Sequence, residues 1–245
     1  MTIDFAPIRQ ESAYRKVAAA LLERITSRTL SEGERLPSEN DLARQFGVNR
    51  STVREALREL QSGGLLVRER GSKLMMVTRP ARDLVVDGVS RALALHDVSY
   101  LDVWESMTLL EPAIAECAAR RRYAEDLRII AAAVAAFAGP RVTAAVAVQR
   151  VGDFFLAVGE ATHNSALMLA HEPLVQLLQP SLAAMIDKLP QARARIAAAQ
   201  QNIAAAIVAR DAVAAREWMA KHVRDFRRGY SLAGIDLELP VKRGG

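Results

Sequence analysis

Hydrophobic residues recur every three to four positions through most of this chain, which is the spacing of one face of an α-helix. Val53 and Leu60, for example, share one face of a helix predicted over residues 50–62. Two short apolar runs at 65–67 and 74–77 differ from this pattern and predict strands. We therefore expect a mostly α fold with one short β-hairpin. The predicted helices are 13–29, 38–47, 50–62, 82–95, 99–121, 124–138, 141–162, 165–178, 180–188, 190–209 and 211–229.

The first 80 residues have the element order of a winged helix-turn-helix domain. Ser38, with Asp41 three residues later, predicts the start of the second helix, and Gly47 predicts its end. A very short turn then leads into a third helix that begins near Arg50, and the two strands follow. In such a domain the third helix enters the major groove of DNA, and the hairpin lies beside it.

The third predicted helix carries the chemistry of DNA recognition. Arg50 and Arg54 are one helical turn apart and can donate to guanine or phosphate, while Ser51 and Thr52 suit phosphate contact at a helix start. The first 80 residues contain 14 Lys and Arg against 10 Asp and Glu, and the whole chain has a net charge of +5. This balance favours a polyanionic partner. The alternative is a small helical domain whose basic helix is merely solvated.

The stretches 33–43 and 47–57 resemble the GntR family of bacterial transcription regulators, and Gly63 to Leu66 with Gly71 continue the match. The family usually has arginine at the position of Asn40, so the operator sequence cannot be carried over. The resemblance implies double-stranded operator DNA as the partner. The positions that it assigns to DNA contact are Asn40, Asn49, Arg50, Ser51, Thr52, Arg54, Arg70 and Gly71.

The rest of the chain predicts an all-α antiparallel bundle. Segments 101–122, 154–164 and 204–222 resemble the FCD-type ligand-sensing domain of the FadR subfamily. That resemblance implies a domain that binds a small-molecule effector and helps to form a homodimer. The domain boundaries expected from the sequence are 1–80 for DNA binding, 81–234 for effector binding and dimerisation, and 235–245 for a mobile tail.

The resemblance also implies a divalent metal held by one aspartate and three histidines, and here this chain departs from the pattern. The four positions are Val151, Phe155, Gln200 and His222. Valine and phenylalanine cannot ligate a metal, and glutamine is a poor ligand for transition metals. We therefore expect no metal and no other cofactor. A replacement site through Asp153, Glu160 or His163 stays open.

A second departure concerns the effector. The subfamily often has an arginine four residues before Glu111, where this chain has Met107. The expected effector is an organic acid, or an acyl or aromatic derivative, that is held partly by apolar contacts. The alternative is a filled pocket that binds no effector. The candidate effector residues are Met107, Val151, Phe155, Asn164, Gln200 and His222.

These patterns lead to one main hypothesis and two rivals. The single cysteine, Cys117, excludes an internal disulfide, and no apolar run is long enough to span a membrane, so a cytoplasmic protein is expected. The main hypothesis is a dimeric repressor that an effector releases from a near-palindromic operator. One rival is an architectural DNA-binding protein with a silent helical domain. The other is an enzyme tethered to DNA, although no paired acid and base or nucleophile motif is present.

Overall fold

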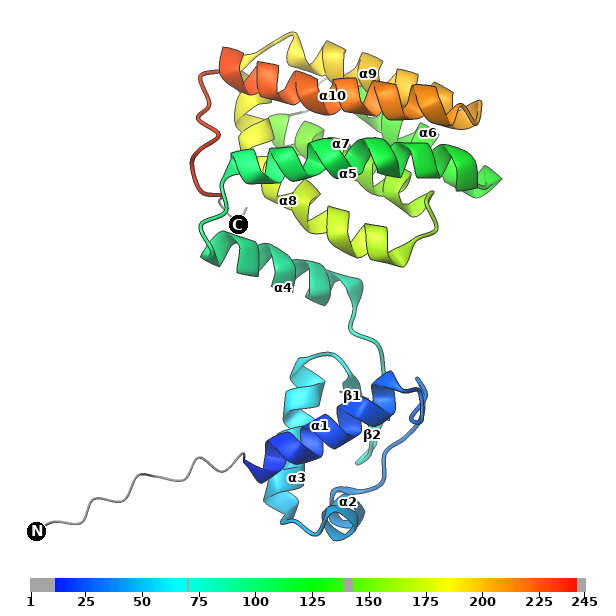
Figure 1. Ribbon diagram of the computed structural model, residues 1–245, viewed down its shortest axis with the longest axis vertical. Helices are drawn as coiled ribbons and strands as arrows, with labels where there is room; N and C mark the ends of the chain where they lie inside the picture. The colour runs from blue at the N-terminus through cyan, green and yellow to red at the C-terminus, as the bar shows by residue number, and fades with distance from the viewer. Residues whose placement is uncertain (1–11, 70, 139–142, 242–245) are drawn as a thin grey trace, which may run out of the picture. The chain divides into compact units, whose positions relative to one another are not determined.

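The computed structural model describes residues 12–69, 71–138 and 143–241, and the chain divides into two compact units, 1–84 and 85–245 (Figure 1). The sequence places the boundary at residue 80, whereas this division falls within helix α4. The elements of the first unit are α1 (Ala13–Thr26), α2 (Glu39–Phe46), α3 (Arg50–Ser62), β1 (Leu66–Arg68) and β2 (Met75–Val77).

The first unit packs α1, α2 and the hairpin around α3. Val53 and Leu57 of α3 are buried together with Leu21 of α1, because the helical spacing places all three on inward faces. The strands β1 and β2 pair antiparallel, with Leu66 opposite Val77 and both side chains buried. The mostly α fold with one short hairpin is thereby confirmed, and the helices position the start of α3 on the surface.

The predicted start and end of α2 are also present. The Ser38 hydroxyl accepts a hydrogen bond from the Asp41 amide at 3.2 Å. Gly47 ends the helix in the left-handed conformation, with φ of 64°, which glycine adopts without steric cost. The next helix begins at Arg50, so the turn between α2 and α3 is as short as the sequence predicts.

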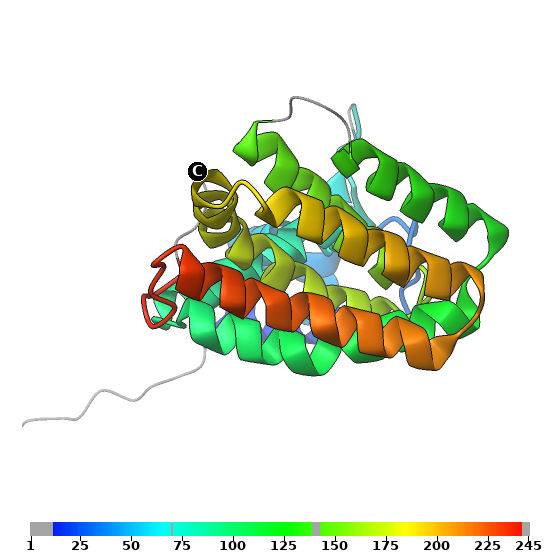
Figure 2. The same ribbon diagram turned by 90° about the horizontal axis from the view of Figure 1, so that it is seen from above.

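The second unit is an antiparallel helical bundle. Helices α5 and α10 lie side by side in both views (Figures 1 and 2), α7 packs on α8, and α9 packs on α10. Their apolar faces form one core of mainly aliphatic side chains with few aromatic ones. The helices are α4 (Arg82–Leu95), α5 (Tyr100–Arg121), α6 (Ala124–Ala138), α7 (Ala144–Glu160), α8 (Ser165–Lys188), α9 (Ala192–Val208) and α10 (Ala212–Leu232).

The break that the sequence predicts between residues 178 and 180 is absent. The predicted helices 165–178 and 180–188 form the single helix α8, which contains both Pro173 and Pro180. A proline removes one backbone hydrogen bond, but the residues around Pro180 bury apolar side chains such as Leu178 and Leu182 in the core. This tertiary packing outweighs the local preference.

The C-terminal segment also differs from the mobile tail expected over 235–245. The amide groups of Tyr100 and Leu101 donate to the carbonyl oxygens of Leu239 and Leu237, and the Val241 amide donates to Val98. The Val241 side chain is buried. The segment 235–241 is therefore attached to the turn between α4 and α5, and residues 242–245 lie outside the described part of the chain. Within the described residues, none of the helices has the length and apolarity needed to cross a membrane.

Candidate functional site

The start of α3 presents exposed side chains, as DNA recognition requires. Arg50 and Arg54 have 58% and 45% of their side-chain surface accessible to solvent. Ser51 is exposed between them, and Thr52 is half-buried. Asn49 occupies the N-cap position, but its side chain makes no capping hydrogen bond. The side chains on this turn are thus available to an external partner.

A single carboxylate, Glu39, organises the arginines of this surface. Its Oε2 atom accepts hydrogen bonds from Arg50 Nε at 2.8 Å and from Arg54 Nη2 at 3.1 Å. Arg68 of β1 approaches its other oxygen at 3.9 Å. The hydrogen bond from Arg50 is the main reason that the pKa of the Glu39 carboxyl lies below its usual value. Glu39 therefore brings α3 and the hairpin into one basic cluster.

Glu39 is a member of this cluster that the sequence reasoning missed. It lies in the first turn of α2, where an acidic residue is ordinarily explained by the helix dipole. Its contacts reach residues 11 and 15 positions later, and they depend on how α2 packs against α3. A polar groove of about 380 Å³ lies beside this cluster, with Arg58 and Gln61 of α3 among its lining residues.

The other predicted DNA positions are spread around this cluster. Asn40 is exposed on α2, next to Glu39. Gly71 has φ of 84°, which is unfavourable for a residue with a side chain, so this turn needs glycine. Arg70, which was also expected to contact DNA, lies outside the described residues.

In the second unit, apolar side chains fill the centre where the family resemblance places a metal. Phe155 stacks against His222 with ring centroids 5.7 Å apart and an interplanar angle of 10°. Met107, Val151 and Phe155 line a void of only about 10 Å³, which is at the lower limit for one water molecule. Gln200 is fully buried from α9, and neither polar atom of its side chain has a hydrogen-bond partner among the described residues.

These residues do not fit a divalent metal. Two of the four family positions carry no donor atom, and His222 contributes the only imidazole. Within the part of the chain that the structure describes, no group of three or more His, Cys, Asp or Glu side chains could hold a metal ion. Asp153, Glu160 and His163, considered as a replacement set, thus form no such group.

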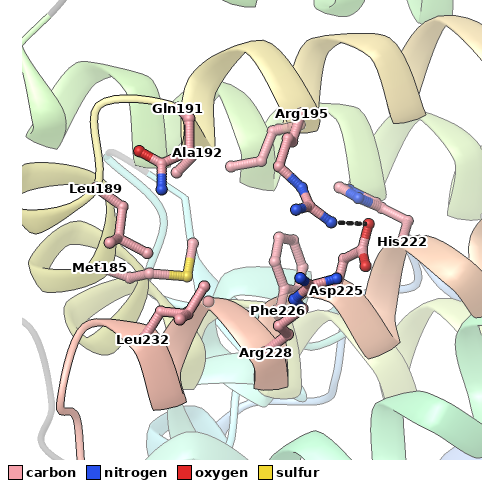
Figure 3. A pocket seen from close by; sticks show the side chains of 12 residues that line it. Met185, Leu189, Gln191, Ala192, Arg195, His222, Asp225, Phe226, Arg228 and Leu232 are labelled. Carbon is pink, nitrogen blue, oxygen red and sulfur yellow. Dashed lines mark ion pairs between the residues drawn. The ribbon is translucent and has the colours of Figure 1, made fainter.

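A cavity of about 40 Å³ lies beside His222, between the end of α8, the start of α9 and the second half of α10 (Figure 3). Met185, Leu189 and Leu232 form an apolar side, and Arg195 faces Asp225 across another side with an N–O distance of 3.1 Å. Its volume holds little more than water, so a metabolite must displace side chains to enter. The remaining lining residues are Gln191, Ala192, Ile196, His222, Phe226, Arg228 and Gly229.

His222 is a neutral hydrogen-bonding group in this setting. Burial lowers its pKa to about 4, and the charge of Asp225 opposes that shift. Its Nε2 atom has no hydrogen-bond partner among the described residues. An uncharged imidazole with a free nitrogen can donate to or accept from a ligand, but near pH 7 it does not offer a positive charge to an anion.

The structure places the predicted effector residues in four different settings. Met107, Val151 and Phe155 line the small void, His222 lines the cavity of Figure 3, and Gln200 is buried in the core. Asn164 instead caps α8, since its side-chain oxygen accepts from the Ala166 and Leu167 amides. Arg195, Asp225 and Arg228 were missed, because charged residues on helices ordinarily indicate a solvated face.

A buried hydrogen-bonded pair on α5 and α8 was missed as well. Glu111 and His171 are completely buried, and Glu111 Oε1 lies 2.8 Å from His171 Nδ1. The second oxygen of Glu111 and the Nε2 atom of His171 have no partner within the described residues. The two residues are 60 positions apart, so only the packing of α5 against α8 brings them together.

Comparison with known proteins matches one family model within each of the two units. Residues 13–74 match the model of the bacterial regulatory proteins of the gntR family, and residues 102–225 match the FCD domain. The Uxu operon transcriptional regulator of Escherichia coli (strain K12) is 31% identical over 157 residues, which cover 63% of this chain and 60% of that regulator.

Two further proteins extend the comparison. The HTH-type transcriptional repressor NanR of Escherichia coli O1:K1 / APEC is 26% identical over 175 residues, which cover 70% of this chain and 66% of the repressor. The chain thus spans less than two thirds of the length of either curated relative. The solved structure of Streptococcus agalactiae GntR superposes with a TM-score of 0.58 at 25% identity, covering 88% of this chain and 99% of that one.

The matched families and relatives are transcription regulators rather than enzymes. With the recognition surface on the first unit and the helical bundle of the second, the chain belongs to the GntR family of bacterial transcription regulators and carries an FCD domain.

Proposed function

We propose that this protein is a homodimeric, cytoplasmic repressor that binds a near-palindromic operator and is released by a small organic acid bound without metal. The observation that carries the DNA-binding part is the exposed cluster of Arg50, Arg54 and Arg68 around Glu39. Two such surfaces in a dimer would contact successive major grooves. NanR, which is named a repressor, supports the sign of regulation proposed here.

The effector part of the proposal rests on the cavity beside His222. It combines an apolar wall with one buried neutral imidazole and two arginines, Arg195 and Arg228. An acid with an apolar body would place its carboxylate near an arginine and accept a hydrogen bond from the imidazole. Since the cavity is small, binding would shift the ends of α8 and α10 and thereby couple the effector to DNA affinity.

The DNA-binding part is tested by an Arg54→Ala substitution in the full chain. Duplexes selected from a random pool supply the operator, and fluorescence anisotropy measures its dissociation constant. A lost guanine contact costs about 1–3 kcal/mol in each protomer, so affinity should fall by roughly 100-fold. Arg128→Ala, an exposed arginine of α6, is the matched control and should change nothing. Unchanged operator affinity in Arg54→Ala would remove the assigned role.

The effector part is tested by thermal unfolding of chelator-treated protein with short carboxylic acids, aromatic acids, acyl thioesters, zinc, nickel and manganese. A ligand at about 100 times its dissociation constant stabilises by about 2.7 kcal/mol. The proposal expects an organic acid to shift the melting temperature and also to weaken operator binding. A shift with metal alone would contradict it, and no shift with any compound would favour the rival in which the helical domain only dimerises.

A further inference from the structure

A second opening in the second unit is separate from the His222 cavity. It is a cleft of about 510 Å³ between α4, α7 and α8, a size that suits a small organic molecule without rearrangement. Two sets of α7 residues line two different openings. Gln149 and Asp153 line the cleft, whereas Val148 and Val151 face the interior void. The cleft therefore lies on a face of α7 next to the one at the family's metal position, and Gly152, Val175 and Gln179 line both openings.

Half of the described residues that line this cleft are polar, and the charged ones among them are acidic. Asp87 of α4 and Asp153 of α7 supply carboxylates, and Gln149, Gln176 and Gln179 supply amide groups from α7 and α8. Among the lining residues that the structure describes there is no lysine, arginine or histidine. An anionic ligand would be repelled here, while a ligand rich in N–H donors would find acceptors on three sides.

The carboxylate of Asp153 is the expected partner for a cationic ligand. It is exposed at the mouth of the cleft and makes no ion pair with any residue that the structure describes. Desolvation by neighbouring atoms raises the pKa of its carboxyl, and Arg150 acts in the opposite direction. The guanidinium of Arg150 donates to the Ala136 carbonyl oxygen instead of pairing with Asp153. An ammonium group in the cleft would offset the cost of this partly desolvated charge.

Helix α4 is the element that such a ligand would affect. Only Val86 and Ser90 of its 14 residues are buried, and the Ser90 hydroxyl donates to Gln176 at 3.4 Å. An element with so few buried contacts is held weakly against the bundle. A ligand that contacts α4, α7 and α8 together would fasten α4, which follows the DNA-binding unit directly in the chain.

From this arrangement we propose that the cleft between α4, α7 and α8 is a binding site for a small organic diamine or polyamine. One ammonium group pairs with Asp153, and further N–H groups donate to the amide oxygens and to Asp87. The binding itself is independent of the effector site. Only the consequence for DNA affinity, through a more firmly held α4, rests on the proposed function.

Isothermal titration of the full chain at pH 8 tests the site with 1,4-diaminobutane and spermidine as probes. The neutral analogue 1,4-butanediol has the same length and no charge, and it should not bind. Asp153→Asn should weaken diamine binding at least tenfold, because a charge-assisted pair becomes a neutral contact. Asp187→Asn, which removes an exposed carboxylate of α8 outside the cleft, is the matched control and should stay within twofold of wild type.

The Asp153→Asn variant should fold normally, since it removes a partly desolvated charge, and its circular dichroism spectrum checks this. No heat of binding with either amine would overturn the proposal, as would equal weakening by the two substitutions. Operator affinity measured on the same samples separates the two ideas: normal DNA binding without amine binding refutes only the cleft, and the reverse refutes only the proposed function.

Discussion

The recognition surface of the first unit and the centre of the second unit handle polar groups in opposite ways. Around Glu39 the arginines lie in water and share one carboxylate, so they can exchange it for phosphate at little cost. In the second unit the Nε2 atom of His222 and both polar atoms of the Gln200 side chain are buried with no hydrogen-bond partner among the described residues. Each one costs free energy until a ligand or water satisfies it. The first region is suited to a large external polyanion, and the second to a small enclosed molecule.

The two regions also differ in which predictions a family resemblance supports. At the recognition surface nearly every family position keeps its residue type, with Asn40 the exception. At the metal position three of the four ligands are replaced, so the resemblance carries the fold but not the chemistry. A resemblance therefore supports a chemical prediction only at positions where the reacting side chains are present.

The largest predicted effect comes from rebuilding the family's metal site. The triple variant Val151→Asp, Phe155→His and Gln200→His, with His222 retained, should bind zinc, because all four donors would then be present. Zinc at about 1,000 times its dissociation constant should raise the free energy of unfolding by about 4.1 kcal/mol, measured by thermal unfolding with and without chelator.

The matched control is Val151→Asp alone, which adds one carboxylate but leaves Phe155 in place. It should show no stabilisation by zinc. A zinc response in the wild-type chain, or none in the triple variant, would show that the four positions are not the ones that decide metal binding.

The second prediction concerns acid stability. The pKa of His222 is about 4 in the folded chain and 6.5 in the unfolded one, so between these pH values the unfolded chain binds the extra proton. Stability is therefore lost as pH falls from 6.5 to about 4, by roughly 3 kcal/mol from this group. His222→Leu should flatten this part of the pH profile.

Urea unfolding followed by tryptophan fluorescence measures this effect, since both tryptophans, Trp104 and Trp218, report on the second unit. His96→Leu is the control, because that histidine is exposed and should keep the wild-type profile. A His222→Leu profile as steep as that of the wild type would contradict the assignment.

The smallest predicted effect is at Glu39. Glu39→Gln removes the carboxylate that aligns Arg50 and Arg54, so discrimination between operator and random DNA should fall roughly fivefold, or about 1 kcal/mol. Binding to random DNA should strengthen slightly and depend more steeply on salt, because one negative charge is lost.

Glu55→Gln is the control for that charge. Glu55 is exposed on α3, and its substitution changes the net charge equally. Anisotropy titrations over a range of salt concentrations should show the loss of discrimination in Glu39→Gln only. The same result in both variants would mean that net charge, and not the alignment of the arginines, sets the preference.

The sequence by itself determined the local features of this protein. The cap at Ser38 and the left-handed Gly47 lie where the residues predict them, because each depends on atoms only a few positions away. The order of helices and hairpin followed from hydrophobic spacing for the same reason, and the replaced ligands at Val151 and Phe155 could be read directly.

Only the tertiary structure decided which distant groups meet. Helix α8 continues through Pro180, and segment 235–241 is hydrogen-bonded to the α4–α5 turn. Arg195 and Asp225 meet beside His222. The arginines of the first unit also meet around Glu39. These contacts depend on how helices pack against one another, and packing energy is summed over whole faces, so no local pattern along the chain encodes a single one of them.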